Sequence, residues 1–231
     1  MTQLERPAAM RLARMAGALY LLIILCGVWS EVAVRGPIRV DGDAAATAAN
    51  ILAREGLYRA AFAADMAMAM ADIALAVLLA ALFWATSPLV AVLAAAFRMI
   101  QASVLANNLS HHHEALMRLE AGAPGAEAAA LHALQMHAHG YDLGLFFFGV
   151  NCLLTGWLIW RSGLVPRAIG AGLAASGVVY LAGSGARFFA PGLSAAVAPA
   201  YAVPLLAETA FCLWLLIAGV RWPAPVQGVR G

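Results

Sequence analysis

The sequence has 231 residues, of which 64% are hydrophobic and 11% are charged, whereas soluble domains carry roughly 25% charged residues. Its formal net charge of +2 is too small to indicate a nucleic-acid partner, and its three cysteines lie in separate apolar segments, which argues against a disulfide framework. This composition is typical of an integral membrane protein, so we expect the lipid bilayer to surround most of the chain.

Six segments are long and apolar enough to cross a bilayer, which requires about 20 mainly apolar residues. In the first, the apolar run of residues 15–30 ends at Glu31 without a small-residue cleavage site, so we interpret this segment as a membrane helix and not as a signal peptide. We predict an all-α fold, a bundle of six transmembrane helices that forms a single integral membrane domain over residues 1–231. The predicted spans are residues 12–34, 57–85, 88–110, 140–160, 164–188 and 199–220.

The connections between these spans contain turn-forming residues. Residues 35–43 are rich in Gly, Pro and Asp and predict a turn-rich connection after the first span. Asp43, its last residue, predicts the N-cap of a short interfacial helix over 44–54. Ser87-Pro88 predicts a tight turn before the third span. Residues 126–138 are expected to extend the fourth span as a helix beyond the bilayer.

The distribution of arginine predicts the orientation. An even number of spans places both termini on one side, and the cluster of arginines before the first span favours the cytoplasm for that side. All six histidines then lie in the outward-facing connection around residues 111–139. Seven arginines lie on the terminal side and six on the other: Arg6, Arg11, Arg14, Arg161, Arg167, Arg221 and Arg230 against Arg35, Arg39, Arg54, Arg59, Arg118 and Arg187.

Several short motifs resemble a known family. They are the run Gly42-Asp43-Ala44-Ala45-Ala46-Thr47-Ala48-Ala49-Asn50-Ile51, then Phe147-Phe148-Gly149 with Gly156, Arg161-Ser162-Gly163 with Pro166-Arg167, and Glu208 followed by Leu213-Trp214. Together they resemble the bacterial integral membrane proteins of domain-of-unknown-function family 4386, over about residues 11–220. The resemblance implies a six-span protein of the bacterial inner membrane. It implies no activity, and no residue inherits a role from it.

Three ionisable residues, Asp72, Arg98 and Glu208, lie near the middle of predicted spans. A charged side chain at the centre of a membrane helix costs about 2.5–3.5 kcal/mol on insertion scales, so such residues need a partner or a function. Arg98 has two carboxylates available at its depth. One interpretation is a structural ion pair that joins helices. The other is a binding site.

Helical periodicity places further polar residues on the same faces, at about 100° per residue. Polar groups in a membrane face the bundle interior or water. The stripes therefore predict one shared, outward-opening cavity with Arg98, Asp72 and Glu208 at its floor. The alternative is a set of unrelated hydrogen-bonding sites between helices. The four stripes are Arg98, Gln101, Asn108 and His112; Tyr58, Asp65 and Asp72; Tyr20, Gly27 and Glu31; and Tyr201 and Glu208.

The histidines allow a metal site as a second hypothesis. His111, His112 and His113 are consecutive and cannot all bind one ion on a helix. A divalent ion such as zinc could be bound by His112, His139 and a carboxylate such as Asp65. The alternative is that these histidines are solvated or interfacial.

Three functions follow from these patterns. The leading prediction is a protein that binds or transports a small polar or anionic ligand in the outward-facing cavity. The first alternative is a membrane-embedded enzyme, metal-assisted through Asp65, His112 and His139. The second is a non-catalytic membrane subunit whose charges stabilise its fold. The sequence contains no phosphate-binding loop, dinucleotide fingerprint or nucleophile elbow, and it predicts no particular oligomeric state.

Overall fold

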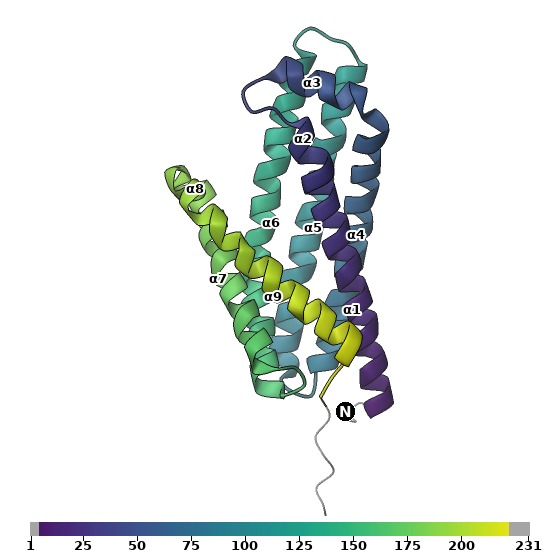
Figure 1. The fold of residues 1–231 in the computed structure, drawn as a ribbon, viewed down its shortest axis with the longest axis vertical. Coiled ribbons are helices and arrows are strands. Elements are labelled where there is room, and N and C mark those ends of the chain that lie inside the picture. Colours follow the sequence, from purple (N-terminus) through teal and green to yellow (C-terminus); the bar gives the residue numbers. More distant parts are fainter. Residues whose placement is uncertain (1–4, 222–231) are drawn as a thin grey trace, which may run out of the picture.

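The computed structural model describes residues 5–221, and all regular structure in this range is helical (Figure 1). The elements are α1 (Arg6–Val28), a π-helical segment (Trp29–Arg35), α2 (Gly36–Ile38), α3 (Ala44–Ala53), α4 (Glu55–Phe83), α5 (Pro88–Glu120), α6 (Ala126–Ser162), α7 (Arg167–Phe189), a 3₁₀ turn (Pro191–Leu193), α8 (Ser194–Val197), a second 3₁₀ turn (Ala198–Tyr201), α9 (Ala202–Leu213) and a second π-helical segment (Trp214–Ala218).

Within the described residues, six helical stretches are long and apolar enough to cross a membrane. This confirms the predicted all-α fold with six spans, and the short apolar helix after the first span is α3. The helix predicted before Gly140 is also confirmed, because α6 is continuous from Ala126 to Ser162. The six stretches are Arg6–Ile38, Glu55–Phe83, Pro88–Glu120, Ala126–Ser162, Arg167–Phe189 and Pro191–Ala218.

The long helices form a closed ring in chain order. Each contacts the next, α7 contacts α9, and α9 with the π-helical segment after it returns to α1. Short connections between antiparallel helices favour such neighbours. Helix α9 crosses α1 obliquely near the N-terminus and diverges from it toward α8 (Figure 1). We call the end that holds Arg6 and Ala218 the terminal end, and the end that holds α3 the histidine end.

Local signals explain most of the connections. The Asp43 side chain accepts a hydrogen bond from the Ala46 amide at 2.8 Å, which confirms it as the N-cap of α3. Ser87 caps α5 in the same way, with Pro88 in the first turn. Gly163 ends α6 with φ of +67°, a conformation that glycine adopts without strain.

The prediction of a turn at Arg35-Gly36-Pro37 is wrong, because the first helical stretch continues to Ile38. It does so through the π-helical segment, in which the Gly36 amide donates to the Glu31 carbonyl oxygen five residues earlier. Pro37 follows in α2 and has no amide hydrogen, so this continuous helix lacks one backbone hydrogen bond there, close to its end at Ile38. Arg35 is therefore helical and points into the bundle, where it is 8% exposed.

Apolar packing occupies both ends of the ring and leaves a polar layer between them. One cluster gathers Ala13, Leu75, Phe83, Ile159 and Phe211 at the terminal end. A second gathers Val34, Ile51, Tyr58, Leu116 and Leu134 at the histidine end. Residues 91 and 94 of α5 belong to the first cluster, and residues 115 and 116 of the same helix belong to the second. The polar positions of α5 fall between these two sets.

Candidate functional site

The polar layer surrounds a chamber of about 410 Å³, the central chamber, to which all six long helical stretches contribute. This volume is typical of small-molecule sites. Apolar side chains such as Ile23, Leu105 and Leu205 make up much of the lining. The polar and aromatic lining consists of Glu31, Asp72, Arg98, Gln101, Tyr141, Phe148, Tyr180, Tyr201, Glu208 and Thr209.

Arg98 forms a buried ion pair with Asp72. Its Nε and Nη2 atoms lie 2.8 and 2.6 Å from Asp72 Oδ1, and both side chains are almost fully buried. The guanidinium carbon also lies 4.9 Å from the ring centroid of Tyr20 and 5.0 Å from that of Phe148. Both distances are within the range of cation–π attraction. Of the two carboxylates available from sequence, Asp72 is therefore the partner of Arg98.

Glu208 has a different environment. It accepts hydrogen bonds from the hydroxyl groups of Tyr20, at 3.0 Å, and Tyr180, at 2.5 Å. Within residues 5–221 it forms no ion pair. Tyr20 thus touches both charged centres, because its ring faces Arg98 and its hydroxyl reaches Glu208. Glu208 is the carboxylate of this chamber that lacks a basic partner.

Gln101 lies next to the ion pair and adds an unsatisfied acceptor. Its Nε2 atom donates to Asp72 Oδ2 at 3.4 Å. Its Oε1 atom is buried and has no hydrogen-bond partner in the described part of the chain. A buried polar atom without a partner costs about 1–3 kcal/mol. The side chain also lines the central chamber, so a ligand placed there can satisfy this atom.

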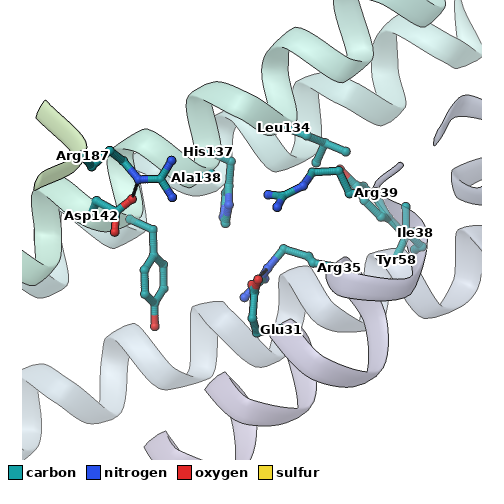
Figure 2. A pocket seen from close by; sticks show the side chains of 11 residues that line it. Glu31, Arg35, Ile38, Arg39, Tyr58, Leu134, His137, Ala138, Asp142 and Arg187 are labelled. Atoms are coloured by element: carbon teal, nitrogen blue, oxygen red, sulfur yellow. Dashed lines mark hydrogen bonds and ion pairs between the residues drawn. The ribbon is translucent and has the colours of Figure 1, made fainter. Parts of the chain in front are cut away.

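A second chamber of about 240 Å³ lies toward the histidine end (Figure 2). Arg35 and Arg39 enter it from the end of the first helical stretch, His137 enters from α6, and Arg187 lies beside Asp142 (Figure 2). Glu31 and Tyr141 line both chambers. Those two side chains therefore mark where the chambers adjoin.

The cations of the second chamber are also paired. Arg35 bonds Glu31 Oε2 at 2.7 Å and also pairs with Asp65. Arg187 pairs with Asp142. These pairs join the first helical stretch to α4, and α7 to α6. The second chamber is therefore lined by ion pairs that connect neighbouring helices.

The predicted ligand-binding residues divide into two groups. The central chamber is lined by Arg98, Asp72, Glu208, Gln101 and Glu31. Asp65 and Asn108 line neither chamber. Asp65 is buried against Arg35, and Asn108 donates from Nδ2 to the His137 carbonyl oxygen at 2.6 Å. Both connect neighbouring helices.

The two predicted metal ligands have separate surroundings. His112 stacks on Tyr58 at 3.9 Å between ring centroids, and its Nε2 atom lies 3.1 Å from the Tyr58 carbonyl oxygen. His139 is directed to the Gln135 carbonyl oxygen and lies near Phe188. Among residues 5–221, no group of three or more His, Cys, Asp or Glu side chains is arranged to hold a metal ion. Zinc binding stays a prediction without geometric support.

Sequence reasoning did not identify three important residues of the chambers. The sequence predicts a turn at Arg35, and its polar stripes do not include Tyr141 or Tyr180. Tyr141 and Phe148 are seven residues apart on α6 and therefore share a face, which is the signal that could have identified the aromatic side of the central chamber. Tyr180 is isolated among small residues of α7 and carries no such signal.

Comparison with known sequences agrees with the resemblance stated above. A family described as "Domain of unknown function (DUF4386)" matches residues 15–219. Neither the curated proteins nor the solved structures contain a match to this chain. The description of the family prints no activity, so the function has to be argued from the chambers.

Proposed function

The chain belongs to the DUF4386 family, and from that premise we propose that this multi-pass membrane protein binds or transports a small polar ligand in its central chamber. The observation that carries the proposal is the placement of Arg98, Asp72, Gln101 and Glu208 around one volume of about 410 Å³. Ionisable residues at membrane depth commonly mark ligand pathways. We also propose that residues 1–231 form one domain, because the long helices close a single ring.

The charged side chains of the central chamber limit the class of ligand that it can bind. The sequence predicts a polar or anionic ligand near Arg98, but Asp72 is already paired with that guanidinium. An anionic ligand would have to displace Asp72 or approach Glu208. The pairing therefore favours a polar ligand that is not a simple anion.

The two alternative functions have less support. A metal-assisted enzyme would need His112, His139 and Asp65 close together, and their separate neighbours do not favour it. A subunit with purely structural charges would account for the Arg98–Asp72 pair. It would not account for an open chamber beside that pair.

We propose that the terminal end faces the cytoplasm of a bacterium, across its inner membrane. Described arginines at that end form no ion pairs, and Arg161, Arg167 and Arg221 lie over tryptophan rings. Unpaired arginines suit an anionic cytoplasmic leaflet, and the tryptophans mark this end as a membrane interface without distinguishing the two sides. Arg230 lies outside the described residues. At the histidine end five arginines pair with carboxylates: Arg35, Arg39, Arg59, Arg118 and Arg187.

Cysteine labelling tests this orientation. Ala123→Cys, in the exposed connection between α5 and α6, is expected to react with an impermeant maleimide in intact cells. Ala85→Cys, exposed between α4 and α5 at the terminal end, is expected to react only after permeabilisation. The parent protein gives the background from its own cysteines. The reverse pattern would refute cytoplasmic termini.

Blocking the chamber tests the binding function. Thr209→Trp places an indole in the central chamber, whereas Leu206→Trp adds the same group to α9 at a site that is 71% exposed. We expect native mass spectrometry of protein from membranes to find a bound small molecule on the parent and on Leu206→Trp. Thr209→Trp should lose it. A bound molecule retained equally by Thr209→Trp, or no bound molecule on the parent, would contradict the proposal.

A further inference from the structure

Glu208 leaves one negative charge of the central chamber unmatched. Asp72 is paired with Arg98, whereas Arg35 is shared between Glu31 and the buried Asp65. Glu208 receives only two tyrosine hydroxyl groups in the described part of the chain. Hydrogen bonds from tyrosine stabilise a carboxylate but do not cancel its charge. A buried carboxylate is stable when a cation pairs with it. The chamber is therefore at least one positive charge short of balance.

Aromatic rings lie beside this carboxylate. The Tyr180 ring lies 5.3 Å from that of Phe148 and 5.9 Å from that of Tyr201, so the three form a continuous wall of the central chamber. The face of an aromatic ring attracts cations, and rings around a carboxylate are well suited to organic ammonium ions. Phe148 already demonstrates this attraction, because Arg98 lies over its ring.

The chamber opens sideways between α1 and α9. Its rim carries Val32, 69% exposed, and Leu205, 55% exposed. Helix α1 and the π-helical segment after α9 meet tightly near the terminal end, where a Cβ on Gly17 would lie 2.6 Å from the Leu216 amide nitrogen. Helices α1 and α9 diverge toward the histidine end (Figure 1). In a six-span membrane protein this opening faces hydrocarbon, so it suits a ligand with an apolar body.

We propose that the central chamber binds a lipophilic organic cation, such as an amine or a quaternary ammonium ion with an apolar body. Its charged group lies beside Glu208 and against the wall formed by Phe148, Tyr180 and Tyr201. Its apolar body extends toward the opening between α1 and α9. An ammonium N–H group can also donate to the unpartnered Oε1 atom of Gln101. This inference rests on the proposed binding function and specifies the ligand class for the same chamber.

Two probes of the same shape and opposite charge test whether the chamber prefers a positively charged ligand. Tetraphenylphosphonium and tetraphenylborate are titrated separately into the full-length protein in a neutral detergent, and binding is followed by calorimetry. We expect saturable binding of tetraphenylphosphonium and none of tetraphenylborate. Preferential binding of tetraphenylborate would overturn the cation inference but leave the proposed binding function in place. Binding of neither probe would overturn the inference, while the Thr209→Trp comparison tests the binding function separately.

A charge-matched pair of variants tests the role of Glu208. Glu208→Gln keeps the size of the side chain and one acceptor oxygen but removes the charge, and it is expected to weaken tetraphenylphosphonium binding about 30-fold, the equivalent of about 2 kcal/mol. Glu127→Gln makes the same change at an exposed site at the start of α6 and should bind like the parent. Parent-like affinity of Glu208→Gln would overturn the proposal. If that variant does not fold, Tyr201→Leu should weaken binding severalfold, and unchanged affinity there would count against the aromatic wall.

Discussion

Arg98→Leu is expected to lower the free energy of unfolding by about 3–5 kcal/mol, since it leaves Asp72 as a buried carboxylate without its counter-charge. The guanidinium is 2% exposed, and its position within α5 places it far from either end of the helix, so it cannot reach water by extending along the surface. The loss also removes the contacts with the Tyr20 and Phe148 rings. Unfolding by sodium dodecyl sulfate in mixed micelles measures the difference.

Two comparisons distinguish a buried ion pair from a general loss of packing. Arg98→Leu combined with Asp72→Leu should recover much of the stability, because no unpaired charge remains. Arg118→Leu removes an arginine that pairs with Glu114 on the exposed surface of the same helix, and it should change stability by no more than about 1 kcal/mol. Parent-like stability of Arg98→Leu would show that the pair contributes no net stabilisation.

The double variant also separates structure from function. If the ion pair only joins α4 to α5, the recovered protein should bind tetraphenylphosphonium like the parent. If the pair shapes the central chamber for its ligand, folding should recover while binding does not. Either result identifies which of the two interpretations of Arg98 holds.

The spans and the polar faces could be predicted from sequence because they depend on local patterns. Hydropathy over about 20 residues identifies a span, and a 100° advance per residue identifies the face on which Arg98 and Gln101 lie. The identity of the partner could not be predicted. Asp72 and Glu208 are both at mid-depth, and only the order of helices around the ring places Asp72 against Arg98 and two tyrosines against Glu208.

There is a physical reason why the sequence does not predict the positions of Arg35 and Tyr180 in the chambers. A π-helical segment adds one residue to a turn, so it shifts every later side chain by about 100° without any change in composition. Gly36 and Pro37 then resemble a turn in sequence although Arg35 stays inside the bundle. Tyrosines at membrane depth are similarly ambiguous, because an aromatic side chain in an apolar helix suits lipid and interior equally. Tyr180 is identified as a chamber residue by its contacts with Glu208, Phe148 and Tyr201, which depend on the tertiary structure.

Two pairs of glycines allow α6 and α7 to pack closely. A Cβ on Gly177 would lie 2.6 Å from the Gly149 carbonyl oxygen, and a Cβ on Gly156 would lie 2.6 Å from that of Gly170. The two pairs are seven residues apart on both helices and allow backbone contact, as small residues do in membrane bundles. A Cβ on Gly185, in contrast, would have no heavy atom of a neighbouring element within 4 Å.

Gly177→Leu is therefore expected to destabilise the protein by about 3 kcal/mol, because the new side chain must displace the backbone of α6. Gly185→Leu, the same change on the same helix, should be neutral or slightly stabilising, since leucine favours helix over glycine by up to about 1 kcal/mol. Unfolding in mixed micelles measures both. Equal stability of the two variants would mean that the glycine pair does not set the distance between the helices.

Gly177→Ala extends this test to the central chamber. Gly149 follows Phe148 on α6, and Gly177 lies one turn before Tyr180 on α7, so the glycine pair sets the separation of these two rings. Even a methyl group at Gly177 would push the helices apart. We expect Gly177→Ala to fold and to bind tetraphenylphosphonium more weakly than Gly185→Ala does. Parent-like binding by Gly177→Ala would mean that the aromatic wall tolerates the displacement, and that Glu208 holds the cation without it.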